Sequence, residues 1–170
     1  MIVFGIDPGY AIVGCGIVQY ENNRFKIMHQ EAVTTPAQMP FTQRLEHVYD
    51  QVDLLIRQYR PDVVAVEELF FHTNQKTAID VAQARGVILL AAIRNQVPLA
   101  EYTPLQVKMS VVGYGRAVKS QVMEMTRILL GLGEVPKPDD VADALAVAIC
   151  HAHNSGSGMH MSNLRIKKGI

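Results

Sequence analysis

The sequence predicts an α/β fold, a five-stranded mixed sheet with helices on both faces. Two observations indicate it. Three β-rich segments follow one another near the start with only short turns between them, which is typical of an antiparallel meander. Further along, short apolar runs alternate with longer segments of helical period, which is typical of parallel strands joined by right-handed crossovers.

The predicted meander occupies the first 35 residues. The apolar run at residues 2–6 predicts a buried strand that ends in Asp7, because Pro8 and Gly9 interrupt the ladder and turn the chain. Residues 11–20 and 24–35 are predicted to be the second and third strands, separated by a turn.

From Phe41 the apolar residues recur at helical spacing, and we expect this helix to end near Tyr59, before Pro61. Another short buried strand then ends in two adjacent acids, Glu67 and Glu68. This strand spans 62–67, and the remaining predicted elements are a helix at 75–96, a strand at 97–102, and helices at 104–112, 119–130 and 140–153.

Length and composition indicate one domain. The chain has 170 residues, of which 49% are hydrophobic and 19% charged. We expect a single domain over residues 1–153 and a flexible basic tail over 154–170. No apolar run reaches the roughly 18–20 residues of a membrane span and no secretory pattern opens the chain, so we expect a soluble cytoplasmic protein. Cys15 and Cys150 lie in apolar sequence and are expected to be buried free thiols.

The formal net charge is zero, but the charges are unevenly distributed. No acid occurs between Glu101 and Glu124, or after Asp143, whereas lysines and arginines occur in both stretches. A basic face beside an acidic pocket would fit this pattern, and so would ordinary solvated surface. Charge alone favours ordinary solvated surface.

Acidic residues follow two of the predicted buried strands. Parallel packing of the first and fourth strands would bring Asp7 and Glu67 to the same sheet edge, where open α/β sheets usually bind ligands. Strand alternation turns Glu68 to the opposite face from Glu67. Asp7 and Glu67 are therefore candidate site residues.

Two further acids begin the last predicted helix. Asp140 and Asp143 are three apart and share one helix face, where two like charges are unfavourable unless a cation neutralises them. Alternatively, these acids only cap the helix, a role for which Asp139 is the natural candidate. A carboxylate set without Cys or His suits Mg²⁺ or Mn²⁺, and two such ions can promote phosphodiester hydrolysis.

Several separate motifs then make a family resemblance specific. The sequence resembles the RuvC family of Holliday-junction resolvases, which are homodimeric, ribonuclease H-like, metal-dependent endonucleases. The motifs are GIDPG at 5–9, VEELF at 66–70, QARG at 83–86, VVGYG at 111–115, KSQV at 119–122 and DDVADALAVAI at 139–149.

The resemblance implies a Mg²⁺-dependent endodeoxyribonuclease with a ribonuclease H-like fold. It would nick two strands of like polarity symmetrically in a four-way DNA junction, during recombination and repair. Its catalytic metal ligands would be Asp7, Glu67, Asp140 and Asp143, and the Asp-x-x-Asp pattern favours Asp140 over Asp139. We expect two Mg²⁺ ions per subunit, with Mn²⁺ as a substitute, and a homodimer that a branch-migration helicase complex assists.

The resemblance also implies DNA contacts outside the acids. Phe70 would insert near the junction centre, although the adjacent Phe71 could take this role. Lys108 and Lys119 would contact phosphate near the scissile bond, and Arg116 lies in the same acid-free segment. Stacking on unpaired bases and lysine contacts to phosphate are common in nucleic-acid binding.

A stripe of small residues, Ala78, Ala82 and Gly86, is our candidate for the dimer face, because two coordinated nicks need two sites at a fixed separation. The stripe could instead pack on its own sheet. Three other functions compete with the resolvase. They are a YqgF-type nuclease acting on RNA, a non-catalytic junction-binding module, and an actin-like ATPase, for which the chain lacks a second phosphate loop.

Overall fold

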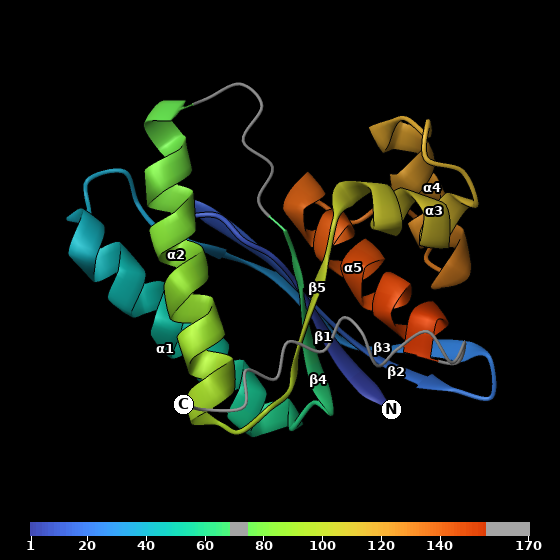
Figure 1. Ribbon diagram of the computed structural model, residues 1–170, viewed down its shortest axis with the longest axis horizontal. Helices are drawn as coiled ribbons and strands as arrows, with labels where there is room; N and C mark the ends of the chain where they lie inside the picture. Colours follow the sequence, from blue (N-terminus) through green and yellow to red (C-terminus); the bar gives the residue numbers. More distant parts are fainter. Residues whose placement is uncertain (69–74, 156–170) are drawn as a thin grey trace, which may run out of the picture.

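The computed structural model describes residues 1–68 and 75–155. Its sheet has five strands in the order β3-β2-β1-β4-β5 (Figure 1). The pairs β1–β2 and β2–β3 are antiparallel, whereas β1–β4 and β4–β5 are parallel, which confirms the predicted mixed sheet. The strands are β1 (Ile2–Asp7), β2 (Ile12–Glu21), β3 (Arg24–Thr34), β4 (Val63–Glu67) and β5 (Leu99–Tyr102).

Five helices in the described ranges cover both faces of the sheet, as predicted. Two of them, α1 and α2, pack together on one face, while α5 crosses the other face with α3 and α4 outside it (Figure 1). Their bounds are α1 (Phe41–Tyr59), α2 (Gln75–Arg94), α3 (Pro104–Val112), α4 (Lys119–Leu129) and α5 (Asp139–Ser155).

The bounds differ from the predicted ones mainly at helix ends. Helix α2 stops at Arg94, and Gln96 has a left-handed backbone with a φ of 59°. Helix α5 begins at Asp139, so this residue is the first of the helix and does not precede it as the expected cap. The helix continues to Ser155, two residues beyond the predicted end. The expected tail at 156–170 lies outside the described residues.

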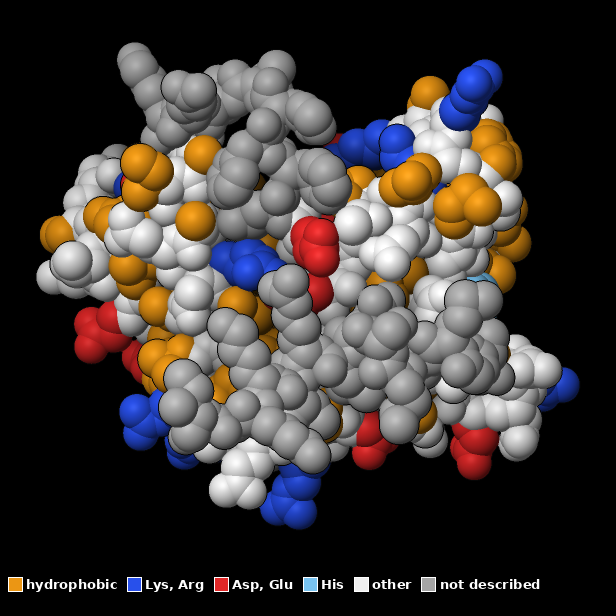
Figure 2. Space-filling model, viewed as in Figure 1, with side chains coloured by type: hydrophobic (Ala, Val, Ile, Leu, Met, Phe, Trp, Pro, Cys, Tyr) orange, Lys and Arg blue, Asp and Glu red, His pale blue; other side chains and the backbone are white. Residues whose placement is uncertain are grey.

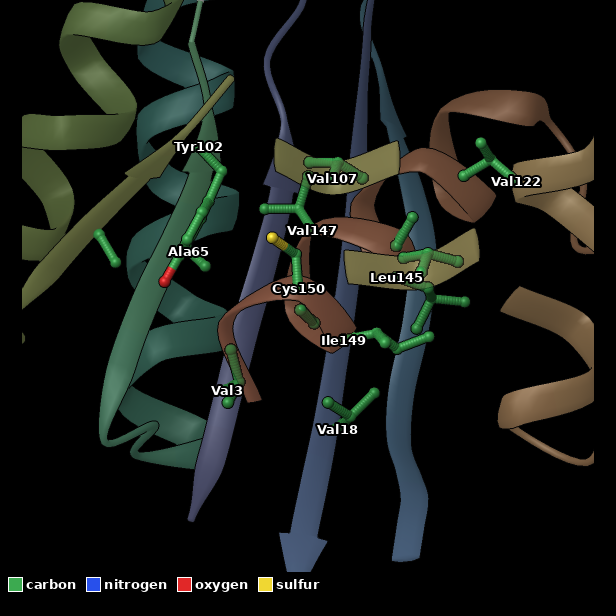
Figure 3. Close-up of a cluster of buried hydrophobic side chains, with 14 of the residues drawn as sticks. Val3, Val18, Ala65, Tyr102, Val107, Val122, Leu145, Val147, Ile149 and Cys150 are labelled. Carbon is green, nitrogen blue, oxygen red and sulfur yellow. The ribbon is translucent and has the colours of Figure 1, made fainter. Parts of the chain in front are cut away.

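Strand alternation divides the core into two layers. Phe4, Ile6 and Val64 face α1 and α2, and pack there with buried residues such as Val52 and Ile88. Val3 and Ala65 face the other way, toward α5 (Figure 3). The sheet therefore carries apolar side chains on both faces, as expected of strands between two helical layers.

Helix α5 is almost entirely enclosed. All its residues from Val141 to Ala152 are buried except Asp143, and Leu145, Val147, Ile149 and Cys150 point into the cluster shown in Figure 3. The helix also carries His151, whose Nδ1 lies 2.8 Å from the buried Tyr102 hydroxyl. The two cysteines are buried free thiols, as predicted. Within the described ranges, no helix combines the length and apolar character needed to cross a bilayer.

Candidate active site

Two candidate acids lie side by side at the carboxyl edge of the sheet. Strands β1 and β4 are parallel with Ile6 beside Val66, so the next residues along, Asp7 and Glu67, continue the same register. Side chains two or four residues apart on a strand share one face. Asp7 therefore lies on the same face as Val3, and Glu67 on the same face as Ala65, and this face packs against α5. Asp7 and Glu67 therefore both face α5.

The adjacent Glu68 is placed differently. It lies just beyond β4, where its backbone N–H donates to the carbonyl oxygen of Tyr102 at 2.8 Å. Alternation along the strand directs it to the α2 side of the sheet, away from Glu67. Glu67 and Glu68 therefore face opposite sides of the sheet, as strand alternation predicts.

The first turn of α5 lies directly over β2 beside Asp7. Asp7 pairs with Gly14 across the antiparallel ladder. A Cβ atom added to Gly14 would lie 1.8 Å from the backbone oxygen of Asp140, so only glycine permits this approach. The missing side chain lets α5 bring Asp140 and Asp143 to the edge that carries Asp7.

The carboxyl of Asp7 is strongly perturbed by this arrangement. Burial, together with the negative charges of Glu67, Asp143 and Asp140, raises its pKa from 3.8 to about 8, although the charge of Lys119 opposes this shift. All four candidate acids therefore lie within electrostatic range of one another around Asp7. Such a group of like charges in a partly buried place favours a bound cation or a bound proton.

The neighbouring acids are shifted in the same direction. Burial and the charge of Asp143 together raise the pKa of Glu67 to about 7, although the charges of Lys119 and Lys108 oppose this shift. Burial also raises the pKa of Asp143, although a hydrogen bond from Lys119 opposes it. Perturbed acids that cluster in a cleft are typical of functional sites.

A cavity of about 210 Å³ opens beside these acids, between the end of β4 and helices α3, α4 and α5. Its polar lining consists of Glu67, Asp143, Lys108 and Lys119, and the rest is apolar. Figure 2 shows acidic side chains near the centre of this face, with basic side chains close by. Two lysines therefore lie beside two candidate acids at this cavity.

Lys119 makes direct ion pairs in the site. Its Nζ lies 2.9 Å from Oδ2 of Asp143 and 3.4 Å from Oδ2 of Asp139. Partial burial lowers the pKa of Lys119, but hydrogen bonds and charges from Asp143 and Asp139 outweigh this, so the net shift is upward. Lys119 is therefore a firmly charged ammonium at the mouth of the cavity.

The remaining predicted DNA contacts are not all assembled here. Lys108, on α3, lines the cavity. Arg116 is exposed in the segment between α3 and α4 and is absent from the cavity lining among the described residues. The predicted contacts of Phe70 and Phe71 lie outside the described residues.

The four candidate acids suit a hard divalent cation, because such ions bind carboxylate oxygens. Burial and mutual repulsion destabilise the charged carboxylates, and a bound cation would neutralise them. In residues 1–68 and 75–155, no three His, Cys, Asp or Glu side chains form a ready-made metal site. Asp143 is instead paired with Lys119. The chemistry of these residues fits a metal ion, and Asp143 would have to leave Lys119 in order to bind it.

Two residues of the site were not assigned by the sequence. Gly14 admits α5, and its position inside a strand was the available signal, since a glycine there often marks a close backbone approach. Asp139 was considered as a cap and as the less favoured alternative to Asp140, yet it contacts Lys119, which begins another helix. No sequence spacing links Lys119 to Asp139, so only the tertiary structure could reveal their contact.

A mixed sheet in the order 3-2-1-4-5, with acids at the ends of its first and fourth strands and on a helix across them, defines the ribonuclease H-like class of fold. The family model "Crossover junction endodeoxyribonuclease RuvC" matches residues 3–151. The chain belongs to the RuvC family.

Individual relatives agree over nearly the whole chain. A crossover junction endodeoxyribonuclease RuvC of Alkaliphilus oremlandii is 60% identical over 153 residues, which cover 90% of this chain and 93% of the relative. The RuvC structure of Thermus thermophilus has 40% identity and a TM-score of 0.88, covering 93% of this chain and 97% of that one. A structure of T. thermophilus RuvC in complex with a Holliday junction substrate has 38% identity and a TM-score of 0.85, with the same coverage.

Proposed function

We propose that this protein is a divalent-metal-dependent endodeoxyribonuclease that resolves four-way DNA junctions by nicking two strands of like polarity. The observation that carries the proposal is the convergence of Asp7, Glu67, Asp140 and Asp143 on one sheet edge, where burial and mutual repulsion raise the pKa of Asp7 to about 8. Full-length relatives named crossover junction endodeoxyribonuclease RuvC support it, as does the solved complex of T. thermophilus RuvC with a Holliday junction.

Asp7, Glu67, Asp140 and Asp143 would hold the metal, which we propose to be two Mg²⁺ ions per subunit, with Mn²⁺ as a substitute. When bound, these ions would activate the attacking water and stabilise the leaving 3′-oxygen, so that the products carry 5′-phosphate and 3′-hydroxyl ends. Asp7 retains a proton at neutral pH because its pKa is about 8, and it must release this proton to act as a ligand.

The lysines of the cavity serve the substrate. Lys108 and Lys119 line the same space as Glu67 and Asp143, so a phosphodiester that reaches the acids also meets two ammonium groups. These positive charges offset the repulsion between the anionic backbone and the carboxylates. Arg116, Phe70 and Phe71 would extend the contact to the rest of the junction.

Symmetric nicking requires two such sites, so we propose a homodimer that pairs through α2. Ile79 and Ile93 on this helix are 66% and 61% exposed, and Ala82 and Gly86 lie between them at heptad spacing. Gly86 has open space beside it, which argues against packing of this stripe on its own sheet. A branch-migration helicase complex would deliver the junction.

The decisive test is cleavage of a mobile synthetic four-way junction in Mg²⁺ or EDTA, by the unaltered protein, Asp7→Asn and Asp50→Asn. Asp50 is an exposed acid on α1, so its variant is the matched control for loss of one charge. We expect paired symmetric nicks from the unaltered protein and Asp50→Asn. EDTA or Asp7→Asn should abolish the nicks and leave junction binding intact.

Other outcomes would indicate a different function. Binding without cleavage in either Mg²⁺ or Mn²⁺ would overturn the nuclease and favour a non-catalytic junction-binding module. Activity on RNA without junction binding or cleavage would favour the YqgF-type alternative. Junction cleavage that persists unchanged in Asp7→Asn would contradict the proposed acid site while leaving the family assignment in place.

A further inference from the structure

The ammonium group of Lys119 is shared by two acids, Asp139 and Asp143, at the mouth of the candidate site. Lys119 begins α4 and Asp139 begins α5, and their side chains are 55% and 58% exposed. The Lys119 Nζ lies 2.9 Å from Asp143 and 3.4 Å from Asp139. The ammonium thus bridges the start of α5 to an acid one turn further along.

The two acids differ in their surroundings. Asp143 is 26% exposed and lines the cavity together with Glu67. Asp139 is more exposed than Asp143 and does not contribute to the cavity lining. A cation that binds in the cavity must therefore compete with Lys119 for Asp143, but it leaves Asp139 available to the lysine.

We propose that Asp139 is a positioning residue, which retains the Lys119 ammonium at the mouth of the site when a divalent cation takes Asp143. The inference rests on the proposed function, because it assigns Asp143 to the metal. With Asp139 present, Lys119 moves from a shared ion pair to a single one and stays beside the incoming phosphate. Without Asp139, displacement from Asp143 leaves Lys119 with neither acid.

Mn²⁺ binding by the full chain tests this role without any cleavage measurement. Electron paramagnetic resonance of free Mn²⁺ gives the dissociation constant for the unaltered protein, Asp139→Asn, Lys119→Met and the double variant. All substituted side chains are largely exposed, so we expect every variant to fold. Asp139→Asn should weaken Mn²⁺ binding about two- to fivefold more when Lys119 is present than in the Lys119→Met background, the range of exposed ion pairs in such cycles.

A parallel cycle with Lys108→Met is the matched control. Lys108 lines the same cavity and carries the same charge, so its removal tests the general electrostatic effect. The effect of Asp139→Asn should be unchanged in the Lys108→Met background. Coupling to Lys119 that is no larger than coupling to Lys108 would overturn the positioning role.

A second readout follows Lys119 itself. In a ¹H–¹⁵N correlation spectrum of the side-chain ammonium groups, the Lys119 signal should persist under saturating Mg²⁺ in the unaltered protein and disappear in Asp139→Asn. Loss of the signal in both proteins would overturn the inference. An equally large Mn²⁺ effect of Asp139→Asn with and without Lys119 would do so too, since Asp139 would then act as a ligand or a field charge. Failure of the unaltered protein to bind Mn²⁺ would instead remove the proposed metal site, a result that the cycles distinguish clearly.

Discussion

Asp7 pairs across the sheet with Gly14, and the space that a side chain on Gly14 would fill is occupied by the first turn of α5. The close approach between Asp7 on β1 and the acids of α5 therefore requires a glycine at position 14. This relationship places a helix N-terminus against a strand end without an intervening layer of side chains.

A Gly14→Ala substitution should destabilise the protein strongly. The new Cβ would lie 1.8 Å from the Asp140 backbone oxygen, so α5 must move away from the sheet. We expect a loss of about 3 kcal/mol in the free energy of unfolding, measured by urea denaturation, because the overlap is with backbone. Gly133→Ala is the control, since a Cβ there meets nothing within 4 Å and should change stability by less than about 0.5 kcal/mol. Equal stability of the two variants would contradict the close approach.

Stability in EDTA should fall as the pH rises. Asp7 keeps its proton in the folded protein up to a pKa of about 8, whereas the unfolded chain loses it near the ordinary value of 3.8. Unfolding then releases protons between these pH values, so the free energy of unfolding decreases from about pH 4 to pH 8 and levels off above. Glu67 adds a smaller contribution of the same sign up to about pH 7.

Asp7→Asn should remove most of this dependence. At pH 3.5 the variant and the unaltered protein should be similarly stable, while at pH 8 in EDTA the variant should be more stable by up to about 5 kcal/mol, or about 10–20 °C in Tm. Adding Mn²⁺ at pH 8 should stabilise the unaltered protein more than the variant. If differential scanning calorimetry gave parallel pH profiles for the two proteins, the pKa of Asp7 would not be raised in the folded state.

Substitution of the adjacent acids Glu67 and Glu68 should affect catalysis very unequally. Glu67→Gln removes a carboxylate on the α5 side of the sheet, so we expect junction cleavage to fall at least about 100-fold, the scale of a lost metal ligand or its support. Glu68→Gln changes the neighbouring side chain on the other face and should retain most of the activity. Single-turnover cleavage rates in Mg²⁺ measure both. A larger loss of activity in Glu68→Gln than in Glu67→Gln would contradict the assignment of Glu67 to the site.

The apolar face of α2 should control association. Ile93 is 61% exposed, so a buried glutamate there would disrupt a dimer and cost the isolated subunit little. We expect Ile93→Glu to sediment as a monomer at micromolar concentration and to leave junctions with unpaired nicks. Leu54→Glu is the control, because Leu54 is 54% exposed on α1 and outside this face. Dimers of unchanged strength in Ile93→Glu would place the interface elsewhere.

Much of the fold could be predicted because local sequence and tertiary environment agree. The change from strand to helical period at Phe41 coincides with the start of α1, and the acids after the buried strands mark the carboxyl edge of the sheet. The end of α2 was placed too late, because the left-handed turn at Gln96 gives no strong local signal. The start of α5 was placed one residue too late because an acid can either cap a helix or begin it.

The site was predictable only in part, for a physical reason. Asp7 and Glu67 follow from strand order, which local patterns indicate, and the assignment of Asp140 over Asp139 depended on the family resemblance. The ion pairs of Lys119 depend on how α4 and α5 meet, which no local pattern encodes. The contribution of Gly14 likewise depends on what crosses above it.

The four candidate acids come from β1, β4 and α5, which lie far apart in the sequence, and this separation bears on what a truncated chain can do. A chain still emerging from the ribosome, or one ended by a premature stop codon before Asp139, has Asp7 and Glu67 but lacks the helix that covers them. It also lacks the seven buried residues that α5 contributes to the apolar cluster on that side of the sheet. We therefore expect a chain truncated before Asp139 to lack junction cleavage, because α5 supplies both a buried layer of the core and two of the four candidate acids.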